Sequence, residues 1–175
     1  DQGRATLDNL WVCGEAASTG LHGANRLASN GLLEALVYAR RAASSIEDTL
    51  GEPANYAPEL DLSFDTAGEP PRTDLVAELR RTMTDCVGVV RDAAGLKTAL
   101  TRIAAIEAAQ PDCDALLNMT ATATLIAASA LIRQESRGAH FRSDFPEADG
   151  DTGVRSRMTL DKALSIRASA AKETA

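Results

Sequence analysis

The sequence has few of the residues that build metal sites or disulfide frameworks. It contains two histidines and three cysteines among 175 residues, and no C-x-x-C pair is present. Because the cysteine number is odd and the spacing is wide, structural zinc and a disulfide framework are both disfavoured. We therefore expect no bound metal, a small buried hydrophobic role for each of Cys13, Cys86 and Cys113, and a cytoplasmic location.

The sequence also lacks an excess of positive charge. Its 25 acidic residues outnumber 18 lysines and arginines, the net charge is −7, and the basic residues form no cluster. Proteins bind a phosphate backbone through clustered lysine and arginine. A nucleic-acid partner is therefore not expected.

No strongly apolar run of clear membrane-spanning length is present. The uncharged run at residues 115–132 contains five Asn, Thr and Ser residues and barely reaches the roughly 20 residues that a bilayer requires. A central helix of a bundle suits this composition better than a membrane span does. Residues 1–9 are polar and the first residue is not Met, so we expect no signal peptide and a fragment or processed chain.

The first fifty residues predict a strand, a glycine-rich loop and a helix. Residues 10–13 form a short apolar run before a glycine, which is typical of a buried strand. Residues 14–30 are rich in Gly, Ser, Thr and Asn and predict a loop. From residue 31 to about residue 50 the apolar residues recur at helical spacing, with Ser29 or Asn30 as the N-cap.

Residues 51–72 hold four of the six prolines and predict a connector. Two amphipathic helical segments follow, with Gly95 between them. Their apolar stripes are Leu75, Leu79, Met83, Val87 and Val90 in the first, and Leu96, Leu100, Ile103 and Ile106 in the second. A third segment, residues 114–136, is apolar or small nearly all round, which is typical of a central helix whose Ala127 and Ala128 are buried.

These patterns predict a mainly α fold in four parts. Residues 1–50 supply the strand, loop and helix, and residues 51–72 the connector. Residues 73–137 are expected to form an antiparallel three-helix bundle. Residues 138–175 are expected to form a C-terminal loop, short elements and a frayed tail.

Both histidines lie in glycine-containing loops next to an arginine: His22 near Arg26, and His140 near Arg137. The first loop directly precedes a predicted helix, whose first turn offers open N–H groups and the positive end of the peptide dipoles. Arg26 adds a planar, permanently charged fork suited to a carboxylate. The pattern indicates an anion site at a loop-to-helix junction.

Three stretches of the sequence resemble the succinate dehydrogenase and fumarate reductase flavoprotein superfamily. Residues 10–34, LWVCGEAASTGLHGANRLASNGLLE, are similar to its second flavin-binding motif. Within them, TGL before HGANR and ASN after it are closer to the L-aspartate oxidases than to the respiratory members. The similarity continues in residues 79–91, LRRTMTDCVGVVR, and in residues 135–146, ESRGAHFRSDFP.

The resemblance implies that FAD is the cofactor. Glu15 matches the family glutamate that binds FAD. Asn30 is expected to bind the cofactor too, and the amides of Gly31 and Leu32 after it match those at the helix start that face the pyrimidine edge of the flavin. The helix N-terminus would stabilise the negative charge of a reduced flavin at that edge. Gly31 departs from the family, which usually has Ser there; backbone donation survives this change.

The resemblance also implies where the substrate lies. Arg26 matches the family arginine that grips a substrate carboxylate, and His22 is expected near the substrate. The early G-x-G-x-x-G fingerprint and the region that supplies the proton-transfer arginine have no match in this sequence. We therefore expect no catalytic residue among these 175 residues, and an interface role for Arg137 and His140 between the bundle and a flavin domain.

The function implied by the resemblance is oxidation of L-aspartate to iminoaspartate, with the reduced flavin reoxidised by O2 or fumarate, for quinolinate and NAD synthesis. The chain alone is expected to be inactive and nearly free of FAD, because N-terminal FAD-binding and capping domains would be its partners. Two alternatives stay open. One is a flavoprotein subunit of succinate dehydrogenase or fumarate reductase, and the other is a non-catalytic interaction module.

Overall fold

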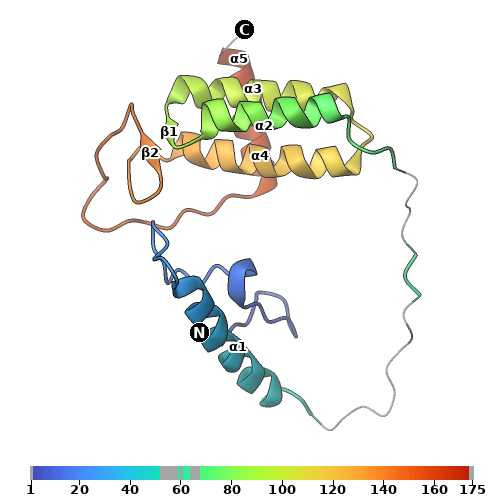
Figure 1. Cartoon of the computed structure of the whole chain (residues 1–175), viewed down its shortest axis with the longest axis vertical. Coiled ribbons are helices and arrows are strands. Elements are labelled where there is room, and N and C mark those ends of the chain that lie inside the picture. The colour runs from blue at the N-terminus through green and yellow to red at the C-terminus, as the bar shows by residue number, and fades with distance from the viewer. Residues whose placement is uncertain (1, 52–58, 60, 64–67, 174–175) are drawn as a thin grey trace. The chain divides into compact units, whose positions relative to one another are not determined.

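A computed structural model describes residues 2–51, 59, 61–63 and 68–173. The chain divides into two compact units, residues 1–63 and 64–175. The division falls within the predicted connector, much of which lies outside the described residues. The described part is mainly helical, with one short two-stranded sheet (Figure 1). Its elements are η1 (Gly14–Ala16), α1 (Asn30–Glu47), α2 (Thr73–Val87), β1 (Val90–Arg91), α3 (Ala93–Ala109), α4 (Asp114–Ile132), β2 (Phe141–Arg142) and α5 (Leu160–Glu173).

Polar contacts fasten the N-terminal segment of the first unit to α1. Arg4 Nε and Trp11 Nε1 both donate to the buried Ser45 hydroxyl, at 3.0 and 3.1 Å. Gly3 has a φ of +74°, and a Cβ there would lie 3.1 Å from the Cβ of Ala42. Both the backbone angle and the close approach favour glycine at this position.

The buried strand predicted at residues 10–13 is wrong. Trp11 forms only an isolated antiparallel bridge with Arg4, and Leu10 and Cys13 are exposed. A strand is stable when its backbone groups pair along its length with a neighbouring strand. Among the described residues, residues 10–13 pair with the segment around Arg4 at one bridge, Arg4 to Trp11.

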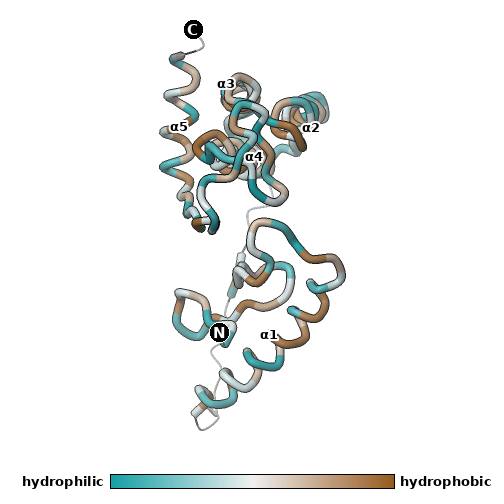
Figure 2. Tube along the Cα trace, turned by 90° about the vertical axis from the view of Figure 1, so that its left-hand side faces the viewer, coloured by the Kyte–Doolittle hydropathy of each residue, from teal (hydrophilic) through white to brown (hydrophobic). Residues whose placement is uncertain are grey.

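Helix α1 forms close to its predicted bounds, but the face it buries is not the apolar one. Leu32, Leu33, Leu36 and Val37 are between 47% and 78% exposed, and Figure 2 shows hydrophobic residues concentrated in the N-terminal half of α1. The residues that α1 buries are Glu34, Ala42 and Ser45. The apolar stripe is therefore left uncovered by the described residues of its own unit.

The second unit has a core shared by four helices. Helices α2, α3 and α4 lie side by side, and α5 packs on α3 and α4 (Figure 1). The predicted stripe of α3 is confirmed as core, since Leu96, Leu100 and Ile103 are fully buried and Ile106 almost so.

The sequence predicted a three-helix bundle at residues 73–137, followed by short elements and a frayed tail at residues 138–175. This prediction is incomplete because a fourth helix belongs to the core. Residues 160–173 form α5, and its Ala163 and Ala170 are buried in the core. The residues that α5 buries best are small alanines, so its apolar stripe is weak and its helical period is hard to recognise in the sequence.

Two boundaries of the predicted helices move. Helix α2 ends at Val87, and Val90 lies in β1, 63% exposed, rather than on the helix stripe. Gly95 lies in the first turn of α3 instead of separating two helices. Its N–H donates to the side chain of the N-cap residue Asp92 at 2.7 Å, an arrangement that begins α3 two residues before Gly95.

Helix α4 packs against α2, α3 and α5, but it is not buried nearly all round as its composition predicts, because Ile126 and Ile132 are 47% and 41% exposed. Ala127 and Ala128 are fully buried, and α4 packs against both α3 and α5. Its length and hydropathy alone would also suit a membrane span. It ends at Ile132, earlier than the predicted residue 136. Cys113 at its start is buried, whereas Cys13 is exposed and Cys86 partly buried, so the expectation of three buried cysteines is wrong for Cys13.

Candidate functional site

The loop before α1 is a series of tight turns. Gly23 N donates to Gly20 O at 3.1 Å, and Asn25 N donates to His22 O at 3.2 Å. Gly20 and Gly23 have φ values of +86° and +56°, a region that favours glycine. The turns bring the loop to Arg26, close to the start of α1.

The first turn of α1 has no side-chain cap. Ser29 is the N-cap residue, with a φ of 65°, but its hydroxyl accepts no capping hydrogen bond. The Asn30 N–H donates to Leu27 O at 3.3 Å. The next two amides, of Gly31 and Leu32, have no acceptor inside a helix because no carbonyl precedes them by four residues within it. They mark the positive end of the α1 dipole.

Arg26 lies against this helix start. Its Nη2 and Nη1 donate to the two carboxylate oxygens of Glu15, at 2.5 and 3.1 Å. A Cβ at Gly31 would lie 1.9 Å from Arg26 Nη2, so the guanidinium occupies the space that a side chain at residue 31 would need. The hydrogen bond and charge of Glu15 raise the pKa of Arg26. The pair is exposed, 55% for Arg26 and 80% for Glu15, so it adds little to stability.

His22 points to a different partner. Its Nε2 lies 2.8 Å from an oxygen of Glu34, whose other oxygen accepts the Thr19 hydroxyl. The Thr19 and His22 hydrogen bonds lower the pKa of Glu34. The structure thus brings Glu15, Arg26 and Gly31 into one contact group, and places His22 in a second group with Glu34.

The second histidine loop is an internal network. Arg91 Nη1 donates to His140 Nδ1 at 2.8 Å, and His140 Nε2 donates to Arg133 O at 3.2 Å. Burial lowers the pKa of His140, opposed by the bond to the Arg133 carbonyl; the nearby arginines lower it further. Arg137 is bound to Glu135 and to the carbonyls of Asp149 and Gly150, at 2.7–2.8 Å.

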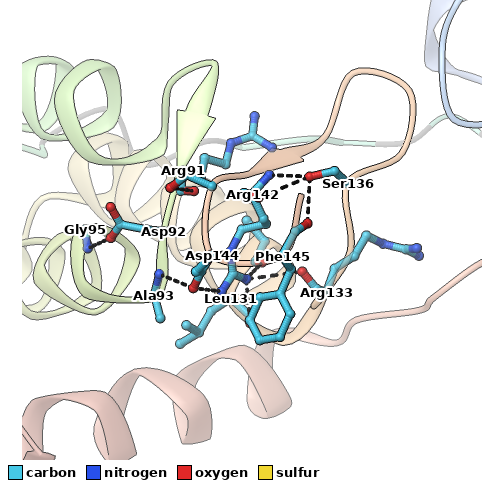
Figure 3. Close-up of polar contacts among 12 residues, drawn as sticks. Arg91, Asp92, Ala93, Gly95, Leu131, Arg133, Ser136, Arg142, Asp144 and Phe145 are labelled. Atoms are coloured by element: carbon cyan, nitrogen blue, oxygen red, sulfur yellow. Dashed lines mark hydrogen bonds and ion pairs between the residues drawn. The ribbon is translucent and has the colours of Figure 1, made fainter. Parts of the chain in front are cut away.

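Arg142 is the buried centre of this network (Figure 3). Its Nη1 donates to three carbonyls at the end of α4, those of Ala130, Leu131 and Arg133. Its Nε and Nη2 each donate at 2.7 Å to Asp144, and this pairing lowers the pKa of Asp144 to about 2. Asp144 also accepts from the Ala93 amide at the start of α3. The network joins the end of α4 to the start of α3.

Sequence reasoning missed several residues of these groups, among them Glu34, Arg142 and Asp144. Glu34 is an acid between leucines in a helix, a pattern that signals either a surface residue or a buried partner. Arg142 and Asp144 are separated by one residue, a spacing that permits the bidentate pair seen here. The sequence pattern at Glu34 does not identify Thr19 and His22 as its partners, and the pattern at Arg142 does not identify the α4 carbonyls. These partners lie in other segments of the chain.

Comparison with known proteins gives the family. Residues 1–32 match the model of an FAD binding domain, and residues 112–170 match the model named fumarate reductase flavoprotein C-term. The chain belongs to the succinate dehydrogenase and fumarate reductase flavoprotein family. This flavoprotein family is FAD-dependent. The first match contains Glu15, His22, Arg26, Gly31 and Leu32, and the second includes α4 and most of α5.

The curated relatives of this flavoprotein are named L-aspartate oxidase. The protein of Rhodospirillum rubrum is 48% identical over 84% of this chain and 53% of its own length. The proteins of Caulobacter vibrioides and Xylella fastidiosa are 45% and 42% identical over 91% and 94% of this chain, but over 29% and 30% of their own lengths. The chain thus spans from under a third to about half of these relatives.

A solved structure has the same fold. The chain described as Mycobacterium smegmatis Sdh1 in complex with UQ1 matches with a TM-score of 0.62 and 29% identity. The match covers 81% of this chain and 28% of that one. This likeness supports the fold of the chain over the 81% that it covers.

Proposed function

We propose that this chain is the C-terminal part of an FAD-dependent L-aspartate oxidase that acts in quinolinate and NAD synthesis in the cytoplasm. The observation that carries the proposal is the placement of the Arg26 guanidinium over the uncapped start of α1, beside Glu15. Two sources of positive potential meet there, and both attract an anion. The names of the relatives, over 84–94% of this chain, support L-aspartate as the substrate.

The residues at the start of α1 fit one edge of FAD. Bound FAD would accept a hydride from the substrate and carry negative charge near its pyrimidine edge when reduced. The Gly31 and Leu32 amides, which follow Asn30, would donate to that edge, and the helix dipole would favour its charge. Gly31 has no side chain, and the Arg26 guanidinium lies in the space that one would take. Glu15, 80% exposed, would contact the cofactor.

Arg26 would hold a carboxylate of the substrate. Its two nitrogens already bind both oxygens of Glu15, which is the geometry that a substrate carboxylate would adopt. Substrate binding would therefore replace or share this contact. We propose that His22, four residues before Arg26 in the same loop, lies near the substrate. L-aspartate has a second carboxylate, for which the N-terminal FAD-binding and capping domains would supply the partner.

This assignment gives each part of the chain a role in the intact enzyme. Residues 1–50 would complete the FAD-binding domain, residues 51–72 would connect it to the helical part, and residues 73–137 with 138–175 would form the C-terminal domain. The proton-transfer residue would come from the N-terminal part. The chain alone would therefore be inactive and would retain little FAD. The intact enzyme would pass electrons from FAD to O2 or fumarate.

The test uses an intact enzyme in which this chain replaces the aligned C-terminal segment of the Caulobacter vibrioides relative. It should release hydrogen peroxide when given L-aspartate. Arg26→Ala should raise KM for L-aspartate roughly a hundredfold, because a bidentate charged contact is lost, with FAD content unchanged. Arg40→Ala, at an exposed position in α1, is the matched control. Equal KM values for the two variants would remove Arg26 from the substrate site.

The second candidate is the flavoprotein subunit of a succinate or fumarate oxidoreductase. The fold similarity to Mycobacterium smegmatis Sdh1 favours it. Reduction of a dye by succinate, without hydrogen peroxide from L-aspartate, would select this candidate over the oxidase.

A further inference from the structure

Glu34 is a buried carboxylate on a helix whose apolar side chains are exposed. It is 9% exposed, whereas Leu33 beside it is 59% exposed. A charged group loses hydration when it is buried, so it persists in that position only with strong partners. The partners of Glu34 therefore indicate why this face of α1 is turned inward.

Both partners belong to the loop that precedes α1. One carboxylate oxygen accepts the Thr19 hydroxyl and the other accepts His22 Nε2 at 2.8 Å. The Thr19 oxygen accepts in turn from the Leu21 amide at 3.2 Å. These bonds lower the pKa of Glu34, so it stays ionised at neutral pH. One side chain of α1 thus holds the loop at two points, residues 19 and 22.

The His22 ring faces inward as well. A carboxylate only accepts, so His22 Nε2 is the donor in this hydrogen bond. Nδ1 is enclosed, and it is the one buried side-chain polar atom without a hydrogen-bond partner found among the described residues. Because one nitrogen is bound to Glu34 and the other is enclosed, the ring in this structure anchors the loop to α1.

The anchor lies four residues before Arg26. Asn25, the residue before Arg26, donates its N–H to His22 O at 3.2 Å. Fixing His22 therefore also restrains the backbone next to Arg26. Arg26 in turn fits into the space left by the missing side chain of Gly31. A shift of the loop would therefore move the guanidinium away from the start of α1.

We propose that Glu34 is a positioning residue, which holds the loop of residues 19–26 through Thr19 and His22 so that Arg26 meets a substrate carboxylate at the start of α1. The role rests on the proposed function, in which Arg26 binds the substrate. It goes beyond that function because both oxygens of Glu34 are bound to the loop, so Glu34 would act through Arg26 and not on the substrate or the cofactor directly.

The experiment introduces Glu34→Gln into the same intact enzyme, in which this chain replaces the aligned segment of the Caulobacter vibrioides relative. Glutamine keeps the shape of the side chain but has one acceptor oxygen, so it cannot accept from Thr19 and His22 on two separate oxygens. We expect KM for L-aspartate to rise roughly tenfold or more, with kcat and FAD content nearly unchanged, because misplacing a binding group by about 1 Å is costly. Glu47→Gln, exposed at the end of α1, is the matched control.

Thr19 provides a second variant and a rescue. Thr19→Val removes the hydroxyl and should raise KM in the same way as Glu34→Gln, whereas Thr19→Ser keeps the hydroxyl and should restore the KM of the unaltered enzyme. A general loss of stability would lower FAD content, kcat and apparent affinity together. Such a joint loss in both Glu34→Gln and Thr19→Val would overturn the positioning role.

The two proposals fail in different ways. If Arg26→Ala raises KM but Glu34→Gln and Thr19→Val behave like Glu47→Gln, the positioning role is overturned and the proposed function stands. If the unaltered enzyme does not oxidise L-aspartate, or if Arg26→Ala has no effect, the proposed function fails and the positioning role falls with it.

Discussion

At the scale of single residues, Arg142 shows why an arginine can stand where a lysine could not. The side chain is fully buried, yet its nitrogens reach both oxygens of Asp144 and three carbonyls of the α4 end. A guanidinium offers five donors in a fixed plane, whereas an ammonium offers three at a single point. A buried charge is tolerated when it is paired and hydrogen-bonded in this way. Arg142 therefore caps the C-terminus of α4 by donating to its last carbonyl groups.

His140 gives the unit a dependence on pH. Because Arg91 can only donate, His140 Nδ1 must accept, so the folded state binds the neutral ring. Burial lowers the pKa of His140 in the folded state below the ordinary value of about 6.5. The unfolded chain then binds more protons than the folded chain as pH falls below about 6.5, so stability is full above that pH and is lost below it.

The measurement is the free energy of unfolding of the 175-residue chain in urea at pH 5 and pH 8, with His140→Gln as the comparison. The unaltered chain should lose more stability between the two pH values than the variant does. Carboxylates with lowered pKa values, such as Glu135 and Asp144, act at lower pH and are common to both proteins. Identical pH slopes would show that His140 is not the titrating group.

Residue roles were predictable from the sequence only where a contact is local or a motif is long. The resemblance singled out Glu15 and Arg26, and these two residues meet in the structure. It gave no partner for His22, because the Glu34 contact depends on which face of α1 turns inward. That choice is made by polar contacts with the loop, and a hydrophobic period cannot reveal it.

At the scale of elements, the fold was most predictable where large apolar residues repeat. The α3 stripe and the centre of α4 are strong signals, and both are buried. The length of α5 was missed, since only short elements and a frayed tail were predicted there, because its best-buried residues are alanines. The strand at residues 10–13 was wrong because a short apolar run does not specify a partner. Gly95 was misplaced because a glycine in the first turn of a helix looks like a break.

The small residues of α4 support a specific expectation. Ala127 is fully buried where α4 is packed by neighbouring helices, so a larger side chain there has no free volume. Ala127→Leu should destabilise the chain by about 1–3 kcal/mol, and the melting temperature should fall accordingly. Ala115→Leu, at an exposed position in the first turns of the same helix, is the control and should change it little. Equal melting temperatures would place Ala127 outside the packed centre.

At the scale of the whole molecule, the two units differ in what holds them together. The core of buried hydrophobic residues lies within residues 75–170. In the described part of residues 1–63, the buried residues are Glu34, Ala42 and Ser45, and Ala42 alone is apolar. Burial of apolar surface is the main stabilising term in folding. The first unit relies on hydrogen bonds instead, and the exposed leucines of α1 form a surface that the N-terminal part of the proposed enzyme would cover.

Hydrogen exchange of backbone amides, followed by mass spectrometry, should reveal this difference in the 175-residue chain. Amides of α3 and α4 open only when the core is lost, whereas those of α1 can open without exposing a core, so protection should be roughly a hundredfold or more greater in α3 and α4. Joining the chain to the N-terminal part of the Caulobacter vibrioides relative should raise protection in α1 and leave α3 unchanged, because only α1 gains a partner for its apolar face. Protection of α1 equal to that of α3 in the chain alone would contradict this account, since it would require a core around α1 that its exposed leucines do not form.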